Sequence, residues 1–147
     1  MRVELFRFAG YDAGQTDFDH VIQRADAPVE GLNQALKHIG DGIAGVTDLR
    51  ASIIVVGHAD HQTLQNLTCD QRWESEVKAA RNRATSAWES VQSVVGTYAA
   101  EGGWTGGDWW EDSDRVTWAL VFAGAGMNLA SAALNRRVDI LVSIFDL

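Results

Sequence analysis

One stretch decides the fold of this chain, Ser52-Ile53-Ile54-Val55-Val56-Gly57-His58-Ala59-Asp60. Its continuous apolar run, rich in β-branched residues, is typical of an inner strand that is covered on at least one face. His58 and Asp60 follow the run directly. The sequence therefore predicts that these two polar side chains lie just past the carboxyl end of a strand.

Two helical patterns flank this strand. Apolar residues recur at helical spacing between Val29 and Ile39, after a proline suited to a first turn and before the glycines at 40, 42 and 45. From Trp73 to about Tyr98 the chain has no proline and a single glycine, and its apolar residues again follow helical spacing. We expect a helix of three to four turns before the strand and a long helix after it.

Three further segments read as strands. Residues 3–8 alternate, the run Val116 to Phe122 is strand-like, and the alternation from Val138 to Ile144 is strict, whereas residues 10–19 read as a loop. Residues 124–133 predict a small-residue loop or short helix. The order strand, helix, strand, helix, strand, strand predicts an α/β (α+β) two-layer sandwich, in which both helices pack on one face of a small mixed sheet.

Bulk properties limit the possible partners. The 147 residues have the size of one domain, 1–147, and the apolar share of 46% is that of a globular protein. The net charge of −8 opposes nucleic acid, and the single cysteine, Cys69, cannot form an intramolecular disulfide. No signal peptide or transmembrane segment is visible, so we expect a soluble protein that is associated with a virion or particle, or cytoplasmic before assembly.

Three short motifs lie on three of these elements. Gly57-His58-Ala59-Asp60 ends the inner strand, Arg83-Ala84 lies on the long helix, and Asn135-Arg136-Arg137-Val138 begins the last strand. In this order the motifs resemble those of the OmpA-like peptidoglycan-binding family, which includes the C-terminal domain of peptidoglycan-associated lipoproteins and flagellar stator subunits. The resemblance spans most of the chain and implies an OmpA-like β-α-β-α-β-β fold.

The resemblance also implies a ligand, the diaminopimelate residue of the peptidoglycan stem peptide. By motif position Asp60 would hold the ammonium group and Arg83 the carboxylate, with His58, Arg136 and Arg137 bordering the pocket. The chemistry is sound, because a carboxylate and a guanidinium both form charge-assisted hydrogen bonds with the two ends of an amino acid. An alternative is that Asp60 and Arg83 form a structural ion pair that binds nothing.

Helical spacing separates the two arginines of the long helix. Arg81 points about 200° around the helix from Arg83, so only one of them can face the sheet end. We expect Arg83 to do so, because Ala84 follows it as in the family motif.

Metal binding and catalysis are weaker readings of the same residues. His58 and His61 with Asp60 suit zinc, because imidazole and carboxylate are both zinc ligands. No further ligand is seen to cluster with them, and we expect no metal and no cofactor. No nucleophile with its base, no phosphate loop and no paired carboxylates stand out. We therefore expect a protein that is not an enzyme, with a metal-dependent hydrolase as a remote alternative.

A Gly- and Trp-rich segment at about residues 102–114 reads as a loop inserted into the domain. Trp104, Trp109 and Trp110 fall within it, and tryptophan is enriched in contact hot spots. The loop could cap one sheet edge and bury its indoles, stack on a glycan, or contact other protein subunits. We favour the protein contact.

The sequence thus predicts a non-catalytic domain that binds the peptidoglycan stem peptide, carried on a phage tail or an injection particle. Such a particle would bring a chain without an export signal to the cell wall. The alternative is a structural subunit of a virion or particle that uses the fold as a scaffold without ligand binding.

Overall fold

The computed structural model describes residues 1–59, 68–123 and 135–146. In chain order its elements are β1 (Arg2–Ala9), α1 (Phe18–Ile22), α2 (Val29–Ile43), β2 (Leu49–His58), α3 (Cys69–Glu101), α4 (Trp109–Asp112), β3 (Val116–Ala123) and β4 (Arg137–Asp146). The predicted order of strands and long helices is confirmed, with the short helices α1 and α4 added to it.

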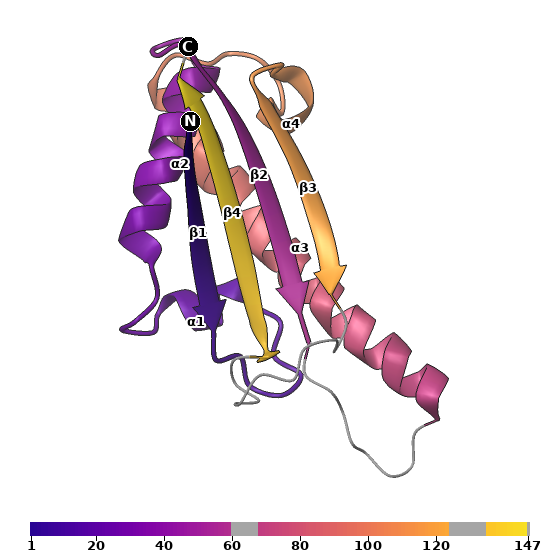
Figure 1. Ribbon diagram of the computed structural model, residues 1–147. Helices are drawn as coiled ribbons and strands as arrows, with labels where there is room; N and C mark the ends of the chain where they lie inside the picture. Colours follow the sequence, from indigo (N-terminus) through magenta and orange to yellow (C-terminus); the bar gives the residue numbers. More distant parts are fainter. Residues whose placement is uncertain (60–67, 124–134, 147) are drawn as a thin grey trace.

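The four strands form one mixed sheet in the order β1-β4-β2-β3. The β1–β4 and β4–β2 pairs are antiparallel, whereas β2 and β3 are parallel. Figure 1 shows α2 and α3 side by side on one face of this sheet, with β1 and β3 at its two edges. The predicted two-layer sandwich, with its helices on one face, is confirmed.

Alternation along the strands divides the sheet into a buried and an open face. Phe8, Ile53 and Ile140 point toward the helices and are at most 1% exposed. On the opposite face Leu5 is 57% exposed, and its neighbours Ile54 and Leu141 are partly covered. The strict alternation of β4 and the inner position of β2 therefore follow the sequence pattern.

Two glycines permit the helices to lie close to their neighbours. A Cβ on Gly57 would meet the carbonyl oxygen of Ala80 at 1.9 Å, so only glycine lets α3 approach β2 at this point. A Cβ on Gly40 would likewise meet the Cβ of Tyr98 at 2.6 Å, where α2 crosses α3. The first of these approaches brings the Arg83 motif against the end of β2.

The loops differ from expectation at three places. Asp17 caps α1 by accepting a hydrogen bond from the Asp19 backbone, so helix begins inside the predicted loop 10–19. The one-turn helix α4 lies within the predicted loop 102–114. The helix α3 begins at Cys69, earlier than predicted, because Thr68 and Gln71 form a capping box. Residues 124–133, predicted as loop or short helix, lie outside the described residues.

Within the described ranges, no helix is both long enough and apolar enough to cross a membrane.

Candidate binding site

Arg83 joins two of the three motifs at one end of the sheet. Its Nη1 donates a hydrogen bond to the carbonyl oxygen of His58, at 2.9 Å, from a position on α3 twenty-five residues further along the chain. The side chain is only 1% exposed. Of the two arginines on this part of α3, Arg83 faces the sheet end and Arg81 is exposed. Helical spacing predicts that only one of them can do so, and the family motif favours Arg83.

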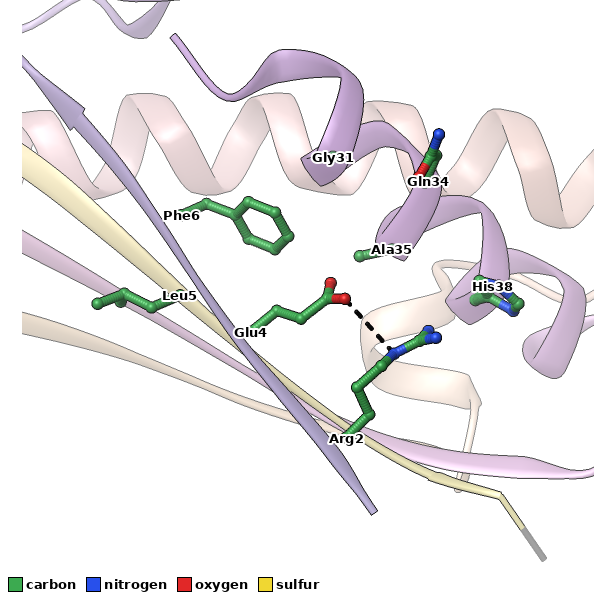
Figure 2. Close-up of a pocket in the computed structure, with 8 residues that line it drawn as sticks. All are labelled: Arg2, Glu4, Leu5, Phe6, Gly31, Gln34, Ala35 and His38. Atoms are coloured by element: carbon green, nitrogen blue, oxygen red, sulfur yellow. Dashed lines mark ion pairs between the residues drawn. The ribbon is translucent and has the colours of Figure 1, made fainter. Parts of the chain in front are cut away.

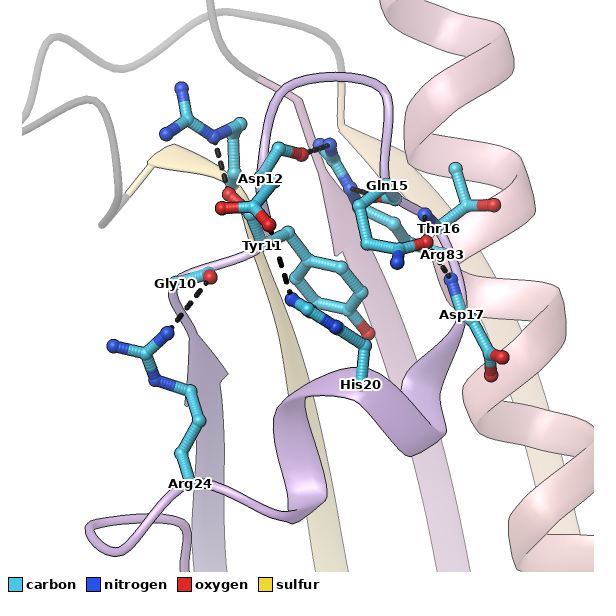
Figure 3. A network of polar contacts seen from close by, with 10 residues as sticks. Gly10, Tyr11, Asp12, Gln15, Thr16, Asp17, His20, Arg24 and Arg83 are labelled. Carbon is cyan, nitrogen blue, oxygen red and sulfur yellow. Dashed lines mark hydrogen bonds and ion pairs between the residues drawn. The ribbon is translucent and has the colours of Figure 1, made fainter.

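The same guanidinium also holds the segment that follows β1. Its Nε donates to the carbonyl of Gln15 at 2.9 Å and its Nη2 to the carbonyl of Asp12 at 3.5 Å. Figure 3 shows this segment folded over Arg83. The contact with Asp12 is the longest of these three hydrogen bonds and lies at the limit of hydrogen-bonding distance. It is therefore the weakest of the three.

The buried aromatic ring of Tyr11 packs against this network. The guanidinium carbon of Arg83 is 5.0 Å from the centre of the Tyr11 ring, a cation–π distance. The Tyr11 side chain is fully buried, and its hydroxyl has no hydrogen-bond partner among the described residues. Burial raises the pKa of Tyr11, the positive charge of Arg83 lowers it, and the negative charge of Asp17 raises it; the net shift is upward, so the phenol is neutral.

The third motif reaches the same place through Arg136. Its Nε donates to the carbonyl of Tyr11, and the Tyr11 backbone nitrogen donates to the carbonyl of Arg136 at 3.3 Å. Residues around positions 11, 58, 83 and 136 are thus held together at the carboxyl end of β2. The structure brings the described parts of all three motifs to one site.

A second polar cluster lies next to this site, on the face of the sheet away from the helices, where Arg137 and Asp139 are themselves buried. The carboxylate of Asp139 accepts hydrogen bonds from Arg7 Nε at 2.9 Å and Arg137 Nε at 3.1 Å, and lies 3.2 Å from His58 Nε2. Burial alone would raise the pKa of Asp139, but hydrogen bonds from His58, Arg7 and Arg137 outweigh it, so the pKa lies well below its usual range. The cluster fixes the directions of His58 and Arg137.

The predicted site residues therefore divide into three groups. Arg83 is buried, His58 and Arg137 belong to the Asp139 cluster, and Arg136 is half-buried beside Tyr11. Asp60, the remaining predicted ligand-binding residue, lies outside the described residues.

Sequence reasoning missed Tyr11, Arg7 and Asp139. Tyr11 and Arg7 gave no signal, because their partners come from the opposite end of the chain. Asp139 could have been found, because it lies two residues after Arg137 on a predicted strand and so shares its face.

The zinc alternative gains no support from the described ranges, in which no group of three His, Cys, Asp or Glu side chains gathers. His61 and Asp60, which that alternative requires, lie outside them.

The Trp-rich segment lies at the other end of the sheet and folds back on the domain. Trp109 is 2% exposed, and its indole nitrogen donates to the carbonyl of Gln92 at 3.0 Å. Trp104 and Trp110 are partly buried against the core. Trp109 is therefore a core residue in this structure, and the predicted partner contact rests on Trp104 and Trp110.

The tryptophans of α3 and β3 differ in exposure. Trp88 is 4% exposed, whereas Trp118, on the edge strand β3, is 40% exposed. The two rings stack with centres 4.6 Å apart.

A separate hollow of about 360 Å³ lies between β1 and α2, away from the motifs. Figure 2 shows Arg2 and Glu4 reaching into it from the edge strand, joined by an ion pair of 3.5 Å, with His38 opposite on α2. Charged side chains therefore line the open flank of β1.

Comparisons with known proteins give matches among solved structures only. No family model matches the chain, and a search of curated proteins finds no match. The periplasmic domain of Helicobacter pylori MotB is 17% identical over 97% of this chain and 88% of that one, with a TM-score of 0.40. The matching structures include a peptidoglycan-associated lipoprotein.

That lipoprotein, from Burkholderia pseudomallei, is 15% identical over 94% of this chain and 90% of its own, with a TM-score of 0.42. The cell wall anchor of the T6SS from Pseudomonas aeruginosa is 21% identical over 96% and 87%, with a TM-score of 0.35. Peptidoglycan-associated lipoproteins are among the proteins that the sequence motifs resemble.

Proposed function

We propose that this chain is a non-catalytic domain that binds peptidoglycan at the carboxyl end of β2. The observation that supports the proposal is the contact between Arg83 Nη1 and the carbonyl of His58, at 2.9 Å. It joins the helix motif to the strand-end motif at the place where the sequence resemblance expects a ligand. Arg136 brings the third motif to the same place through Tyr11.

In this proposal Asp60 and Arg83 form a clamp for the diaminopimelate residue of the stem peptide. Asp60 accepts hydrogen bonds from the ammonium group, and Arg83 donates to the carboxylate. Arg83 is buried under the Gly10–Asp17 segment, so the ligand must reach it past that segment. The carboxylate would replace the Asp12 carbonyl, whose 3.5 Å contact is the weakest of the described bonds.

Sedimentation with purified sacculi tests the proposal. The wild-type chain should sediment with diaminopimelate-containing sacculi, while Asp60→Asn and Arg83→Lys should remain in the supernatant. Lysine keeps the charge of Arg83 but cannot form the two parallel bonds of a guanidinium fork.

Two matched variants serve as controls. Arg81→Lys changes the exposed arginine two residues before Arg83, and Asp48→Asn changes an exposed carboxylate near the opposite end of β2. Both should sediment like the wild type. The proposal is wrong if the wild type stays in solution, or if the controls lose binding together with the two site variants.

A second candidate function is a structural subunit of a virion or particle. It is favoured by the exposed apolar side chains of β3, among them Val121 at 44% and Phe122 at 39%. This candidate goes with two further predictions. The chain would be carried on a phage tail or an injection particle, and Trp104 and Trp110 would contact another protein subunit. A chain that assembles but does not sediment with sacculi would favour this candidate.

A further inference from the structure

The two edges of the sheet differ in how they are protected from other strands. The edge strand β1 reads Arg-Val-Glu-Leu-Phe-Arg-Phe-Ala and carries three charges on its eight residues. The edge strand β3 reads Val-Thr-Trp-Ala-Leu-Val-Phe-Ala, with no charge and no proline. Charged side chains and proline are the usual means by which an edge strand avoids pairing, and β3 has neither.

The outer hydrogen-bonding groups of the β3 backbone pair with no other described strand. The nitrogen of Ala51 on β2 donates to the carbonyl of Arg115, so in this parallel pair the odd-numbered residues of β3 point their backbone groups at β2. The even-numbered residues from Val116 to Phe122 then point theirs outward. Among the described elements, β3 pairs with β2 alone.

Side chains on this edge are apolar and exposed. Trp118 is 40%, Val121 44% and Phe122 39% exposed, and they belong to both faces of the strand. A long, apolar and uncharged edge with outward N–H and C=O groups is a template for another strand.

We propose that β3 is a dimerisation edge, along which the β3 strands of two copies of this chain pair antiparallel. The two-fold axis would pass near Ala119 and Leu120, at the middle of the strand, perpendicular to the sheet. The helices of both copies would then lie on the same side of one continuous sheet.

The charges at the two ends of β3 favour this arrangement of two copies. Exposed carboxylates precede its amino end, on α4 and the turn after it, at Glu111, Asp112 and Asp114. At its carboxyl end the guanidinium of Arg81 lies 5.6 Å from the Phe122 ring centre, and the exposed Lys78 lies one helical turn earlier on α3. Antiparallel pairing places the acidic end of each copy against the basic end of the other.

Light scattering of the purified chain, combined with one substitution on each edge, tests the proposal. The wild type should have about twice the chain mass of 16.0 kDa. Val121→Lys places a charge on the open face of β3 and should reduce the mass to that of one chain. Leu5→Lys makes the matching change on β1, at a residue 57% exposed, and should leave the dimer intact.

Disulfide trapping gives a second readout that does not depend on Val121→Lys folding well. In a Cys69→Ser background, Ala119→Cys should form a cross-linked dimer on oxidation, and Leu5→Cys should not. Directly opposite residues that are not hydrogen-bonded lie about 4.5 Å apart between Cα atoms, within disulfide reach. If the two-fold axis passes through Leu120 instead of Ala119, residue 119 of one copy lies opposite residue 121 of the other. The double variant Ala119→Cys with Val121→Cys would then form the cross-link.

A wild type of single-chain mass at every concentration would overturn the proposal. So would a dimer that Leu5→Lys dissociates and Val121→Lys does not, or a dimer in which neither set of β3 cysteines forms a cross-link.

Discussion

The two ends of the sheet are held together by opposite means. At the carboxyl end of β2, a buried arginine gathers backbone carbonyls from segments far apart in the chain. Figure 1 shows α4 at the opposite end, where β2 and β3 begin. There the indoles of Trp88, Trp109 and Trp118, from α3, α4 and β3, pack on one another. A polar network needs each donor and acceptor in place, whereas apolar packing stabilises without directional partners. The polar end is the one to which we assign binding in the proposal above.

The largest change in stability is expected from a substitution at the aromatic end of the sheet. Trp109→Ala should lower the free energy of unfolding by about 4 kcal/mol, because it removes a buried indole that packs edge-on against Trp88. Denaturant unfolding measures this change. Sacculus binding by the fraction that remains folded should be unaltered, and a specific loss of binding would show that the two ends are not independent.

A smaller loss is expected when the polar end is broken. Arg83→Met should cost about 3 kcal/mol, because the carbonyls of Asp12, Gln15 and His58 lose a charged donor inside the protein. Denaturant unfolding again gives the value, with Arg81→Met as the exposed control on the same helix. An equal and small effect of both substitutions would contradict the structural role of Arg83.

The Asp139 cluster should make stability depend on pH in the acid range. The pKa of Asp139 is lowered in the folded state, so its contribution is complete above the unfolded pKa of about 3.9 and is lost as the pH falls through the folded value. Asp139→Asn should cost about 2 kcal/mol at neutral pH and flatten the decline in stability below about pH 4.

Melting temperatures across the acid range test this prediction. Asp48→Asn is the control, since the Asp48 carboxylate also pairs with an arginine, at 2.9 Å, but is 68% exposed. If both variants keep the acid decline of the wild type, the Asp139 cluster does not cause it.

Tyr11→Phe should have the smallest effect. The Tyr11 hydroxyl is buried and meets no hydrogen-bond partner in the part of the chain that the structure describes, so its removal should leave stability unchanged or raise it by about 1 kcal/mol. The phenyl ring keeps its place beneath Arg83. A marked loss of stability on thermal unfolding would indicate that the hydroxyl has a partner in solution.

The sequence predicted those features that depend on local pattern. Alternation identified the buried side of β4. Helical spacing indicated that only one of Arg81 and Arg83 faces the sheet end, and the motif with Ala84 selected Arg83. The carbonyl partners of Arg83 could not be predicted, because Asp12 and Gln15 lie about seventy positions away in a loop without periodicity. The 40% exposure of Trp118 could not be predicted either, since the apolar pattern of β3 does not reveal that this strand lies at an edge of the sheet.

Binding of two soluble muropeptides tests the central proposal most directly. One carries diaminopimelate in its stem peptide and the other carries lysine, which has the ammonium group but lacks the second carboxylate. Titration calorimetry should show binding of the diaminopimelate peptide and at least about tenfold weaker binding of the lysine peptide, since the contact with Arg83 is lost. Equal affinity for the two peptides, or no binding of either, would contradict the clamp of Asp60 and Arg83.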